Sequence, residues 1–363
     1  MRIGMISLGR RGSAGPLGLN LARHLQPLTP LFAVISAYVE NRADWSAAGL
    51  SLLEVPTYRS LPQALLSWLN QPRLHHLAQQ IRQRRPDVLL FPMFHSWSPF
   101  LQFYLREIPA VVVVHDPNPH PGDWDWILEN FSIRRAARCV LLSETLKPAL
   151  IQRGVSPQQI DVIPHGLLFD PVTPARAAHK EGLPVILFFG RITPYKGLDV
   201  LLLAYRELIA TNQAQLLIVG EGRIEPYRAL LDGLETVEVI NRWIPDEDIA
   251  PLFDRADVLV LPYTSATQSG VLTIAAAHRL PVVATRTGGL VEQIRAGETG
   301  LLVEPGSSEQ LRRALQQLLE NPQQAAALGA ALAQDFTANR SWEKIANLFL
   351  ESCRKAAGSL IND

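Results

Sequence analysis

The chain has 363 residues, of which 47% are hydrophobic and 19% charged, a composition typical of globular proteins rather than disordered or fibrous ones. Basic and acidic side chains balance at 34 each, which argues against nucleic acid as a partner. The two cysteines are too few for a disulfide framework, and no Cys/His cluster has the spacing of zinc ligands.

No apolar run reaches the roughly 18 residues that a membrane span requires. Arginines interrupt the N-terminal stretch MRIGMISLGRRG, which is also too short for a secretory signal. We therefore expect a cytoplasmic protein.

Short β-branched runs alternate with helical segments along the chain, which is typical of parallel α/β sheets. The predicted strands are Ile3–Leu8, Leu31–Ser36, Val88–Phe91, Val111–Val114, Arg138–Leu142 and Ile160–Ile163 in the first half, then Val185–Phe189, Gln215–Val219, Val237–Ile240, Val258–Leu261, Pro281–Ala284 and Leu301–Val303. Several of them are apolar at consecutive positions, as expected of strands that helices cover on both faces.

The two halves differ in charge, which favours separate domains. Residues 1–178 carry 17 basic and 12 acidic side chains, and the remainder carries 17 and 22. Between the halves, residues 170–184 are rich in proline and polar residues. We predict two doubly wound, Rossmann-like domains at 1–172 and 184–338, a linker at 173–183, and a C-terminal helix at 339–363 that packs back on the first domain.

This last helix has apolar residues at helical spacing. Its predicted buried face contains Trp342, Ile345, Leu348 and Phe349. Since ligands of doubly wound sheets bind beyond the carboxyl ends of the strands, two such domains facing each other would hold a ligand in a central cleft.

A glycine-rich loop, SLGRRGSAGPLG, follows the first predicted strand. Its glycines do not have the spacing of a dinucleotide-binding loop. Close approach of the backbone to a ligand is the best reason for Gly12 and Gly15.

Two segments of the first half have two interpretations each. The basic stretch 67–85 carries Trp68, Leu69, Leu74, Leu77 and Ile81, so it either lies on an anionic membrane or turns this apolar stripe into the core. The aromatic stretch 91–104 either lines an acceptor site or belongs to the core.

Polar residues follow several of the predicted strands. His115 comes directly after the run VVVV, where it either hydrogen-bonds a substrate hydroxyl or caps the strand. His165 and Glu221 also follow strands, and each is an equally unspecific signal.

The strongest local pattern is FFGRITPYKGLDVLLLAY, in which an apolar strand, a short loop and an amphipathic helix follow one another. Gly190 and Gly197 permit close backbone approach to a ligand. Arg191 offers a planar fork and Lys196 a point charge, a combination suited to a diphosphate. The alternative is a pair of solvated surface cations.

A second loop, YTSATQSG, leaves the strand Val258–Leu261 and enters a helix near Val271. Backbone N–H groups and hydroxyls at a helix N-terminus can bind an anion without a formal charge, which makes Gln268, Ser269 and Gly270 candidates. A generic polar loop is the competing interpretation.

Taken together, these segments resemble family 4 of the retaining, nucleotide-sugar-dependent glycosyltransferases, which have the α/β GT-B fold. The resemblance covers almost the whole chain. Its carriers in the second half are GRITPYKG at 190–197, VGEGR at 219–223, YTSATQSG at 263–270, LPVVATRTGGLVE at 280–292 and AGETGLLVEPG at 296–306. In the first half, VVHD at 113–116 and VIPHG at 162–166 fit the same family.

The resemblance implies a donor sugar nucleotide on the second domain and an acceptor on the first. Arg191 and Lys196 would hold the donor diphosphate and stabilise charge on the leaving phosphate. His115 would lie near the transferred sugar, and Gly190, Ser269 and Gly270 would belong to the phosphate-binding loops. Gly12 and Gly15 would approach the phosphates or the acceptor. Members usually need no metal ion and no protein nucleophile.

The chain departs from the family at two glutamates that are normally eight positions apart. They correspond to Ala266 and Ile274, neither of which can bind a hydroxyl group. Losing a charged contact to the ribose would cost about 1.5–3 kcal/mol unless it is replaced. Gln268, Thr273 or Glu221 are the candidates to replace it.

We therefore expect a retaining glycosyltransferase that moves a sugar from a UDP- or GDP-linked donor to a glycan or lipid-linked acceptor, in cell-surface polysaccharide or glycolipid synthesis. No other cofactor is expected, and contact with an anionic membrane would place it on the inner face of the plasma membrane. The alternatives are a sugar-nucleotide epimerase or hydrolase, and a non-catalytic nucleotide-sugar-binding protein.

Overall fold

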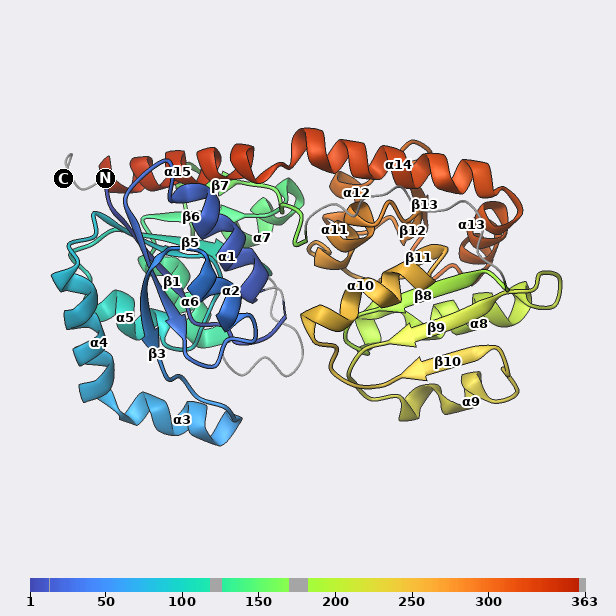
Figure 1. Ribbon diagram of the computed structural model, residues 1–363, viewed down its shortest axis with the longest axis horizontal. Helices are drawn as coiled ribbons and strands as arrows, with labels where there is room; N and C mark the ends of the chain where they lie inside the picture. Colours follow the sequence, from blue (N-terminus) through green and yellow to red (C-terminus); the bar gives the residue numbers. More distant parts are fainter. Residues whose placement is uncertain (13, 118–125, 170–181, 359–363) are drawn as a thin grey trace. The chain divides into compact units, whose positions relative to one another are not determined.

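The computed structural model describes residues 1–12, 14–117, 126–169 and 182–358. The chain divides into two compact units (Figure 1). The first comprises Met1–Gly166 with Trp342–Asp363, and the second comprises Leu167–Ser341. Residues 173–181 of the predicted linker lie outside the described residues.

The first unit contains a parallel sheet of seven strands in the order β3-β2-β1-β4-β5-β6-β7. The strands are β1 (Ile3–Ser7), β2 (Leu31–Ser36), β3 (Ser51–Val55), β4 (Val88–Phe91), β5 (Ala110–Val114), β6 (Arg138–Leu141) and β7 (Ile160–Val162). The six predicted strands are confirmed. The additional strand β3 lies at the sheet edge with its first residues partly exposed, so its sequence SLLEV lacks the continuous apolar run of a central strand.

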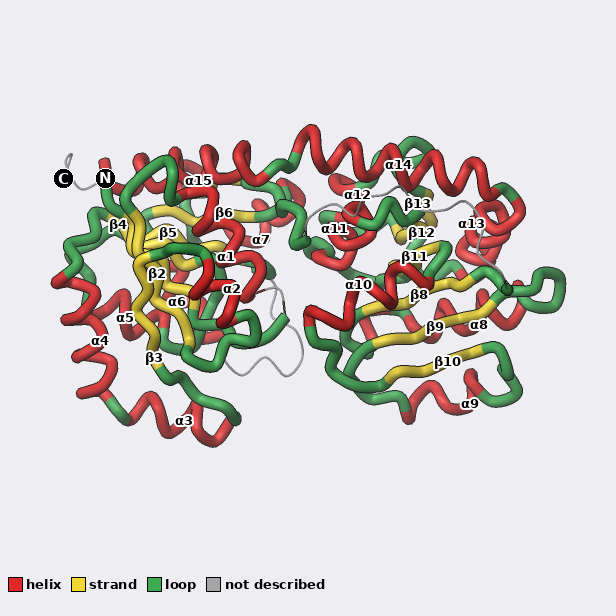
Figure 2. The backbone as a smooth tube through the Cα atoms, in the orientation of Figure 1, coloured by secondary structure: helices red, strands yellow, loops and turns green. Residues whose placement is uncertain are grey.

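Helices cover both faces of this sheet (Figures 1 and 2). They are α1 (Ala14–Leu25), α2 (Arg42–Ala47), α3 (Leu61–Leu69), α4 (Gln71–Gln83), α5 (Ser98–Tyr104), α6 (Trp126–Arg135), α7 (Lys147–Gln152) and α15 (Trp342–Gly358). Helices α4 to α7 contribute to one core, which contains Leu77, Leu101, Ile133 and Leu150.

The C-terminal helix α15 packs on α1 and on strands β4, β5 and β6 of the first unit. Trp342, Ile345 and Phe349 are buried, as predicted. The prediction for Leu348 is wrong, because this residue is 41% exposed. The buried face instead continues through Leu350 and Cys353, since the helix turns this side toward the sheet.

The second unit contains a parallel sheet of six strands in the order β10-β9-β8-β11-β12-β13. The strands are β8 (Val185–Phe189), β9 (Gln215–Val219), β10 (Val237–Ile240), β11 (Val258–Leu261), β12 (Val282–Thr285) and β13 (Leu301–Val303), which confirms the predicted series. The helices are α8 (Leu198–Leu208), α9 (Arg228–Leu231), α10 (Asp246–Arg255), α11 (Gly270–Ala277), α12 (Leu290–Gln293), α13 (Ser308–Glu320) and α14 (Pro322–Asn339).

Alternate residues of β8 point into different cores, which is why the strand is apolar throughout. Ile186 and Phe188 pack with α8 and α13, whereas Val185 and Leu187 pack with α10 and α11. Each of the two sheets is thus doubly wound.

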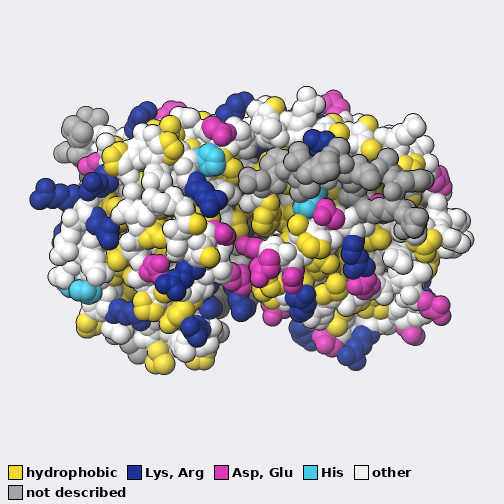
Figure 3. Space-filling view, viewed as in Figure 1, with side chains coloured by type: hydrophobic (Ala, Val, Ile, Leu, Met, Phe, Trp, Pro, Cys, Tyr) yellow, Lys and Arg dark blue, Asp and Glu magenta, His cyan; other side chains and the backbone are white. Residues whose placement is uncertain are grey.

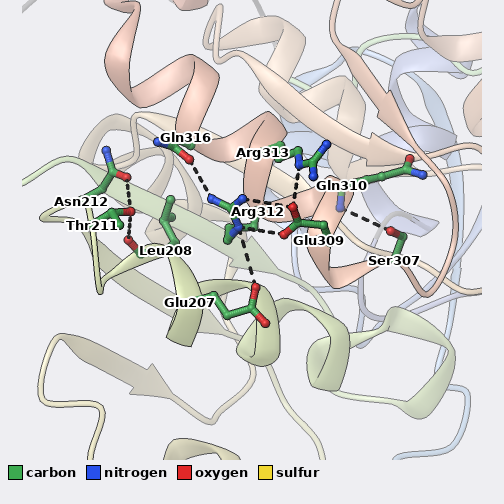
Figure 4. A network of polar contacts seen from close by, with 10 residues as sticks. All are labelled: Glu207, Leu208, Thr211, Asn212, Ser307, Glu309, Gln310, Arg312, Arg313 and Gln316. Carbon is green, nitrogen blue, oxygen red and sulfur yellow. Dashed lines mark hydrogen bonds and ion pairs between the residues drawn. The ribbon is translucent and has the colours of Figure 1, made fainter.

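An ion pair links helix α8 to helix α13 (Figure 4). Arg312 on α13 lies 3.7 Å from Glu207 on α8, and 2.9 Å from Glu309 on its own helix. Helix α8 begins at Leu198, so this ion pair joins α13 to the helix that follows the predicted diphosphate loop.

Basic and acidic side chains are both spread over the face shown in Figure 3. No helix among the described residues combines the length and the apolar composition needed to cross a bilayer. The same residues contain no group of three or more His, Cys, Asp or Glu side chains arranged to hold a metal ion.

Candidate functional site

Glycines shape the loop that follows β8, at the carboxyl edge of the second sheet. Gly190 has a φ of +125°, and its carbonyl oxygen would lie 1.9 Å from a Cβ at Gly220. Gly197 has a φ of +68°, and a Cβ there would lie 1.9 Å from the carbonyl oxygen of Pro262. Only glycine fits at these positions, so the loop after β8 packs closely against the chain that follows β9 and β11.

Lys196 ends a short 3₁₀ turn in this loop and lies partly buried over an aromatic ring. Its Nζ atom is 3.7 Å from the centroid of the Tyr263 ring. Burial, together with the nearby positive charge of Arg191, lowers the pKa of Lys196 to about 8. Arg191 itself is exposed. An anion bound next to Arg191 and Lys196 would therefore compensate the positive charge of Lys196, which the fold has partly removed from water.

The loop after β11 is attached to the first loop by backbone contacts. The N–H of Thr264 donates to the carbonyl oxygen of Tyr195 at 2.8 Å. The two predicted donor loops, which are about 70 residues apart in sequence, thus lie side by side at one sheet edge.

Ser269 is buried, and its amide is already occupied. Its N–H donates to Oε1 of Gln293 at 3.0 Å, and its hydroxyl lies 3.3 Å from that of Tyr263. In this structure a buried glutamine thus takes the hydrogen bond of the Ser269 amide, and a role of Ser269 in phosphate binding stays a prediction. Gly270, the first residue of α11, remains partly exposed.

Thr273 is fully buried in α11. Its hydroxyl donates to the carbonyl oxygen of Gly270 at 2.7 Å and accepts from the N–H of Leu168 at 3.3 Å. The Thr273 hydroxyl is thus used inside the unit, which favours Gln268 and Glu221 over Thr273 as replacements for the ribose-binding glutamate; the Thr273 role stays a prediction. Ile274, at the position of that glutamate, belongs to the hydrophobic core.

Two other side chains in these loops carry a buried polar atom without a hydrogen-bond partner among the described residues. They are Gln268, through Oε1, and Thr193, through Oγ1. Buried polar atoms in native proteins normally have partners, so both atoms are candidates for ligand contacts. Thr193 and Tyr263 were not singled out from the sequence, although both lie in the two loops that were predicted to bind the donor.

Glu221 follows β9, next to the loop that contains Arg191. Its carbonyl oxygen accepts from the N–H of Ile192 at 3.0 Å, and its side chain is exposed. It therefore remains available, with Gln268, as a replacement for the family glutamate.

In the first unit, His115 follows β5 at the carboxyl edge of the sheet. Its Nε2 atom lies 3.0 Å from the carbonyl oxygen of Pro92, so this nitrogen carries a proton and donates. Burial lowers the pKa of His115, and the contact with Pro92 partly offsets this shift. The neutral ring therefore presents Nδ1 as a hydrogen-bond acceptor, suited to a sugar hydroxyl.

The two glycines predicted in the loop after the first strand are explained by different local features. Gly12 has a φ of +68°, which favours glycine, and Ser13 lies outside the described residues. Gly15 lies in the first turn of α1, where a Cβ would approach Oδ1 of Asn41 to 2.5 Å. Packing against Asn41 thus accounts for Gly15, and approach to a ligand is not needed to explain it.

The ambiguous segments of the first half are largely part of the core. In α4, Leu74, Leu77 and Ile81 are buried, so this stripe does not face a membrane. Phe91 and Trp97 are also buried. The side chains of Trp68 and Leu69 lie outside the described part of the chain. The packing interpretation therefore holds for these buried side chains, whereas Phe103 is exposed.

Family models match both units. The model described as "Glycosyl transferases group 1" matches residues 183–321, and "Glycosyltransferase Family 4" matches residues 19–167.

The curated relatives of this chain are also named as sugar transferases. D-inositol 3-phosphate glycosyltransferase of Rhodococcus opacus is 36% identical over 222 residues, which cover 56% of this chain and 49% of the relative. The chain thus spans about half the length of this relative. A GDP-mannose-dependent monoacylated alpha-(1-6)-phosphatidylinositol monomannoside mannosyltransferase of Corynebacterium glutamicum is 34% identical over 297 residues, covering 74% of this chain and 76% of the relative.

Solved structures share the fold over nearly the whole chain. Anabaena HepE in complex with UDP and glucose gives a TM-score of 0.77 at 19% identity, covering 97% of this chain and 99% of that one. Sucrose-phosphate synthase from Thermosynechococcus elongatus gives 0.75 at 21% identity, covering 99% of both chains. These likenesses establish the architecture of two Rossmann-like units.

Proposed function

This chain belongs to glycosyltransferase family 4, and from that premise we propose that it transfers a sugar from a nucleotide diphosphate sugar to a hydroxyl group of an acceptor, with retention of anomeric configuration. The observation that carries the proposal is the partly buried Lys196 over Tyr263, next to Arg191 at the edge of a doubly wound sheet. Two cations in this position suit the diphosphate of the donor.

In the reaction, the bond between the anomeric carbon and the leaving phosphate oxygen breaks. The bond to the acceptor oxygen forms on the same face of the sugar, and the leaving phosphate takes the acceptor proton. Arg191 and Lys196 stabilise the charge that develops on that phosphate. This route needs no protein nucleophile, and His115 would contribute by accepting a hydrogen bond from a hydroxyl of the transferred sugar.

The ribose would be bound without the family's second glutamate. Gln268 supports this role because its buried Oε1 can accept a hydrogen bond from a ribose hydroxyl. Glu221 is the second candidate, since its exposed carboxylate lies at the neighbouring strand end. We propose a UDP- or GDP-linked donor, in line with the names of the relatives and of the HepE complex.

For the acceptor, we propose a glycan or a lipid-linked glycan of the cell surface. The relatives named above act, by their names, on an inositol phosphate and on a phosphatidylinositol mannoside. A lipid-linked acceptor would bring the protein to the inner face of the plasma membrane from the cytoplasm.

The test is a thermal-shift series with UDP, GDP, ADP and their sugars on wild type, Arg191→Ala and the matched control Arg228→Ala. Arg228 is an exposed arginine on α9 in the same unit. A ligand at 100 times its dissociation constant stabilises a fold by about 2.7 kcal/mol, which is easily seen as a higher melting temperature. We expect one nucleotide to stabilise wild type and Arg228→Ala but not Arg191→Ala.

A second candidate function follows from Ala266 and the buried Ile274, which replace both family glutamates. A non-catalytic protein would bind the nucleotide sugar without turnover, whatever acceptor is supplied. Consumption of the nucleotide sugar without any acceptor would instead identify a hydrolase or an epimerase. If no nucleotide stabilises the wild-type protein, the proposed transfer reaction is wrong.

A further inference from the structure

The first unit contains a hollow of about 590 Å³ that the proposed reaction does not use. Its walls are the first turns of α4 and the chain that follows β2 and β3, at the carboxyl edge of the sheet. Trp97, which follows β4, is also part of its lining. The volume lies within the roughly 300–1,000 Å³ that small-molecule sites occupy.

One stripe of α4 lines this hollow. Arg73, His76 and Gln80 are spaced three and four residues apart, so they share a face of the helix. Arg73 is half-buried, and its guanidinium lies 5.3 Å from the centroid of the Trp97 ring. One of its five N–H groups donates to the carbonyl oxygen of Pro56, which leaves the planar fork able to donate further hydrogen bonds.

The charges around the hollow favour an anion. None of the ion pairs among the described residues includes Arg73, and the carboxylate of Glu54 is already 2.7 Å from Arg42. Arg59 adds a second cation, since its guanidinium lies 4.1 Å from the centroid of the Tyr38 ring at the rim. A half-buried guanidinium without a carboxylate partner is able to bind an external anion.

Another basic residue of the same helix shows the contrast. Arg82 pairs with Glu107 at 2.6 Å and also donates to the carbonyl oxygen of Tyr104. Its charge is therefore neutralised within the chain, whereas that of Arg73 is not. Of these two basic residues in the segment 67–85, Arg82 thus makes structural contacts and Arg73 lines the hollow.

We propose that this hollow binds the phosphate of a phosphorylated glycan or glycosylated polyol, with Arg73 and His76 as hydrogen-bond donors to the phosphate oxygens. The proposal rests on the proposed function, because it makes this molecule the acceptor. Gln80 can hydrogen-bond sugar hydroxyls beside the phosphate.

The phosphate can come from a soluble phosphomonoester or from the headgroup of a lipid. The first arm of the test titrates inositol 1-phosphate and unphosphorylated inositol into wild type, Arg73→Gln and the control Arg106→Gln by calorimetry. Arg106 is an exposed arginine of the same unit, outside the hollow. We expect inositol 1-phosphate to bind wild type and Arg106→Gln alike, and Arg73→Gln at least tenfold more weakly.

The second arm measures co-sedimentation with phosphatidylcholine vesicles with and without phosphatidylinositol. Recruitment by phosphatidylinositol that needs Arg73 identifies a lipid-linked acceptor, whereas binding of the soluble phosphate alone identifies a soluble one. His76→Gln, at an exposed position, provides a second variant if Arg73→Gln fails to fold, with an expected loss of at least threefold.

The proposal is overturned if wild type and the folded variants bind inositol 1-phosphate equally, or if wild type binds neither probe. The nucleotide-induced thermal shift and its dependence on Arg191 are measured on the same proteins. Because that readout belongs to the second unit, the failure of the phosphate site and the failure of the proposed function are distinguishable.

Discussion

Lys196 shows how a single buried cation can couple donor binding to pH. Burial holds its pKa at about 8, below the usual range of lysine, so it loses its proton as the pH rises through that value. A diphosphate interacts best with the protonated ammonium group, so its affinity should fall above pH 8.

We predict that the dissociation constant for the nucleotide rises about eightfold between pH 7.5 and 9.0, if only the protonated Lys196 binds. Calorimetric titration across this range measures the effect. Lys196→Arg is the matched variant, because a guanidinium stays charged at these pH values. An equally steep dependence in Lys196→Arg would assign the titration to another group.

Variants of Gln268 and Thr273 distinguish a side chain that contacts the ligand from one that only packs inside the unit. Gln268→Ala should raise the dissociation constant for the nucleotide three- to tenfold, the value of about one hydrogen bond. Thr273→Val should leave that constant unchanged but lower the free energy of unfolding by about 1–2 kcal/mol, because two buried hydrogen bonds are lost. Nucleotide titration and denaturant unfolding of both variants test the assignment, which fails if Thr273→Val is the one that weakens binding.

At the scale of elements, one carboxylate of the sheet adds polar contacts to the apolar packing of helix α15. Asp161 on β7 accepts two hydrogen bonds from Arg138 on β6, at 2.5 and 2.7 Å, and one from the hydroxyl of Ser352 at 2.7 Å. Lys355 lies 3.7 Å away. Burial alone would raise the pKa of Asp161, but Arg138, Ser352 and Lys355 together hold it below the usual range.

Asp161→Asn should therefore lower the free energy of unfolding by about 3 kcal/mol at neutral pH, since it leaves Arg138 without its partner. The folded pKa lies below the unfolded one, so the stabilising contribution is present above the unfolded pKa and is lost as the pH falls through the folded value. The difference between wild type and Asp161→Asn should shrink below about pH 4. Denaturant unfolding at pH 7 and pH 3 measures it, with Glu343→Gln, at an exposed position of the same helix, as the control.

Loops and strands differ in how far their sequences predict them. The loops at 190–197 and 263–270 could be located from the sequence, because each follows an apolar strand and precedes a helix. The edge strand β3 could not, because a strand with solvent on one side has no continuous apolar run.

At the scale of the whole molecule, the first unit is built from two separate stretches of sequence. The chain leaves it at Gly166 and returns at Trp342. A Cβ at Gly166 would lie 2.8 Å from Cε2 of Trp342, so the point where the chain leaves this unit packs directly against the point where it returns. The first unit is therefore completed by a helix that follows the whole of the second unit in the sequence.

The sequence by itself determined the alternation of strands and helices, the two doubly wound sheets and the positions of Arg191 and Lys196, because these features depend on local patterns of apolar residues and glycines. Tertiary structure decided that the Ser269 amide and the Thr273 hydroxyl are occupied, that Leu348 is exposed and that Arg73 lines a hollow. The physical reason is that burial and hydrogen-bond partners are set by residues far away in sequence, as Gln293 is for Ser269 and Leu168 for Thr273.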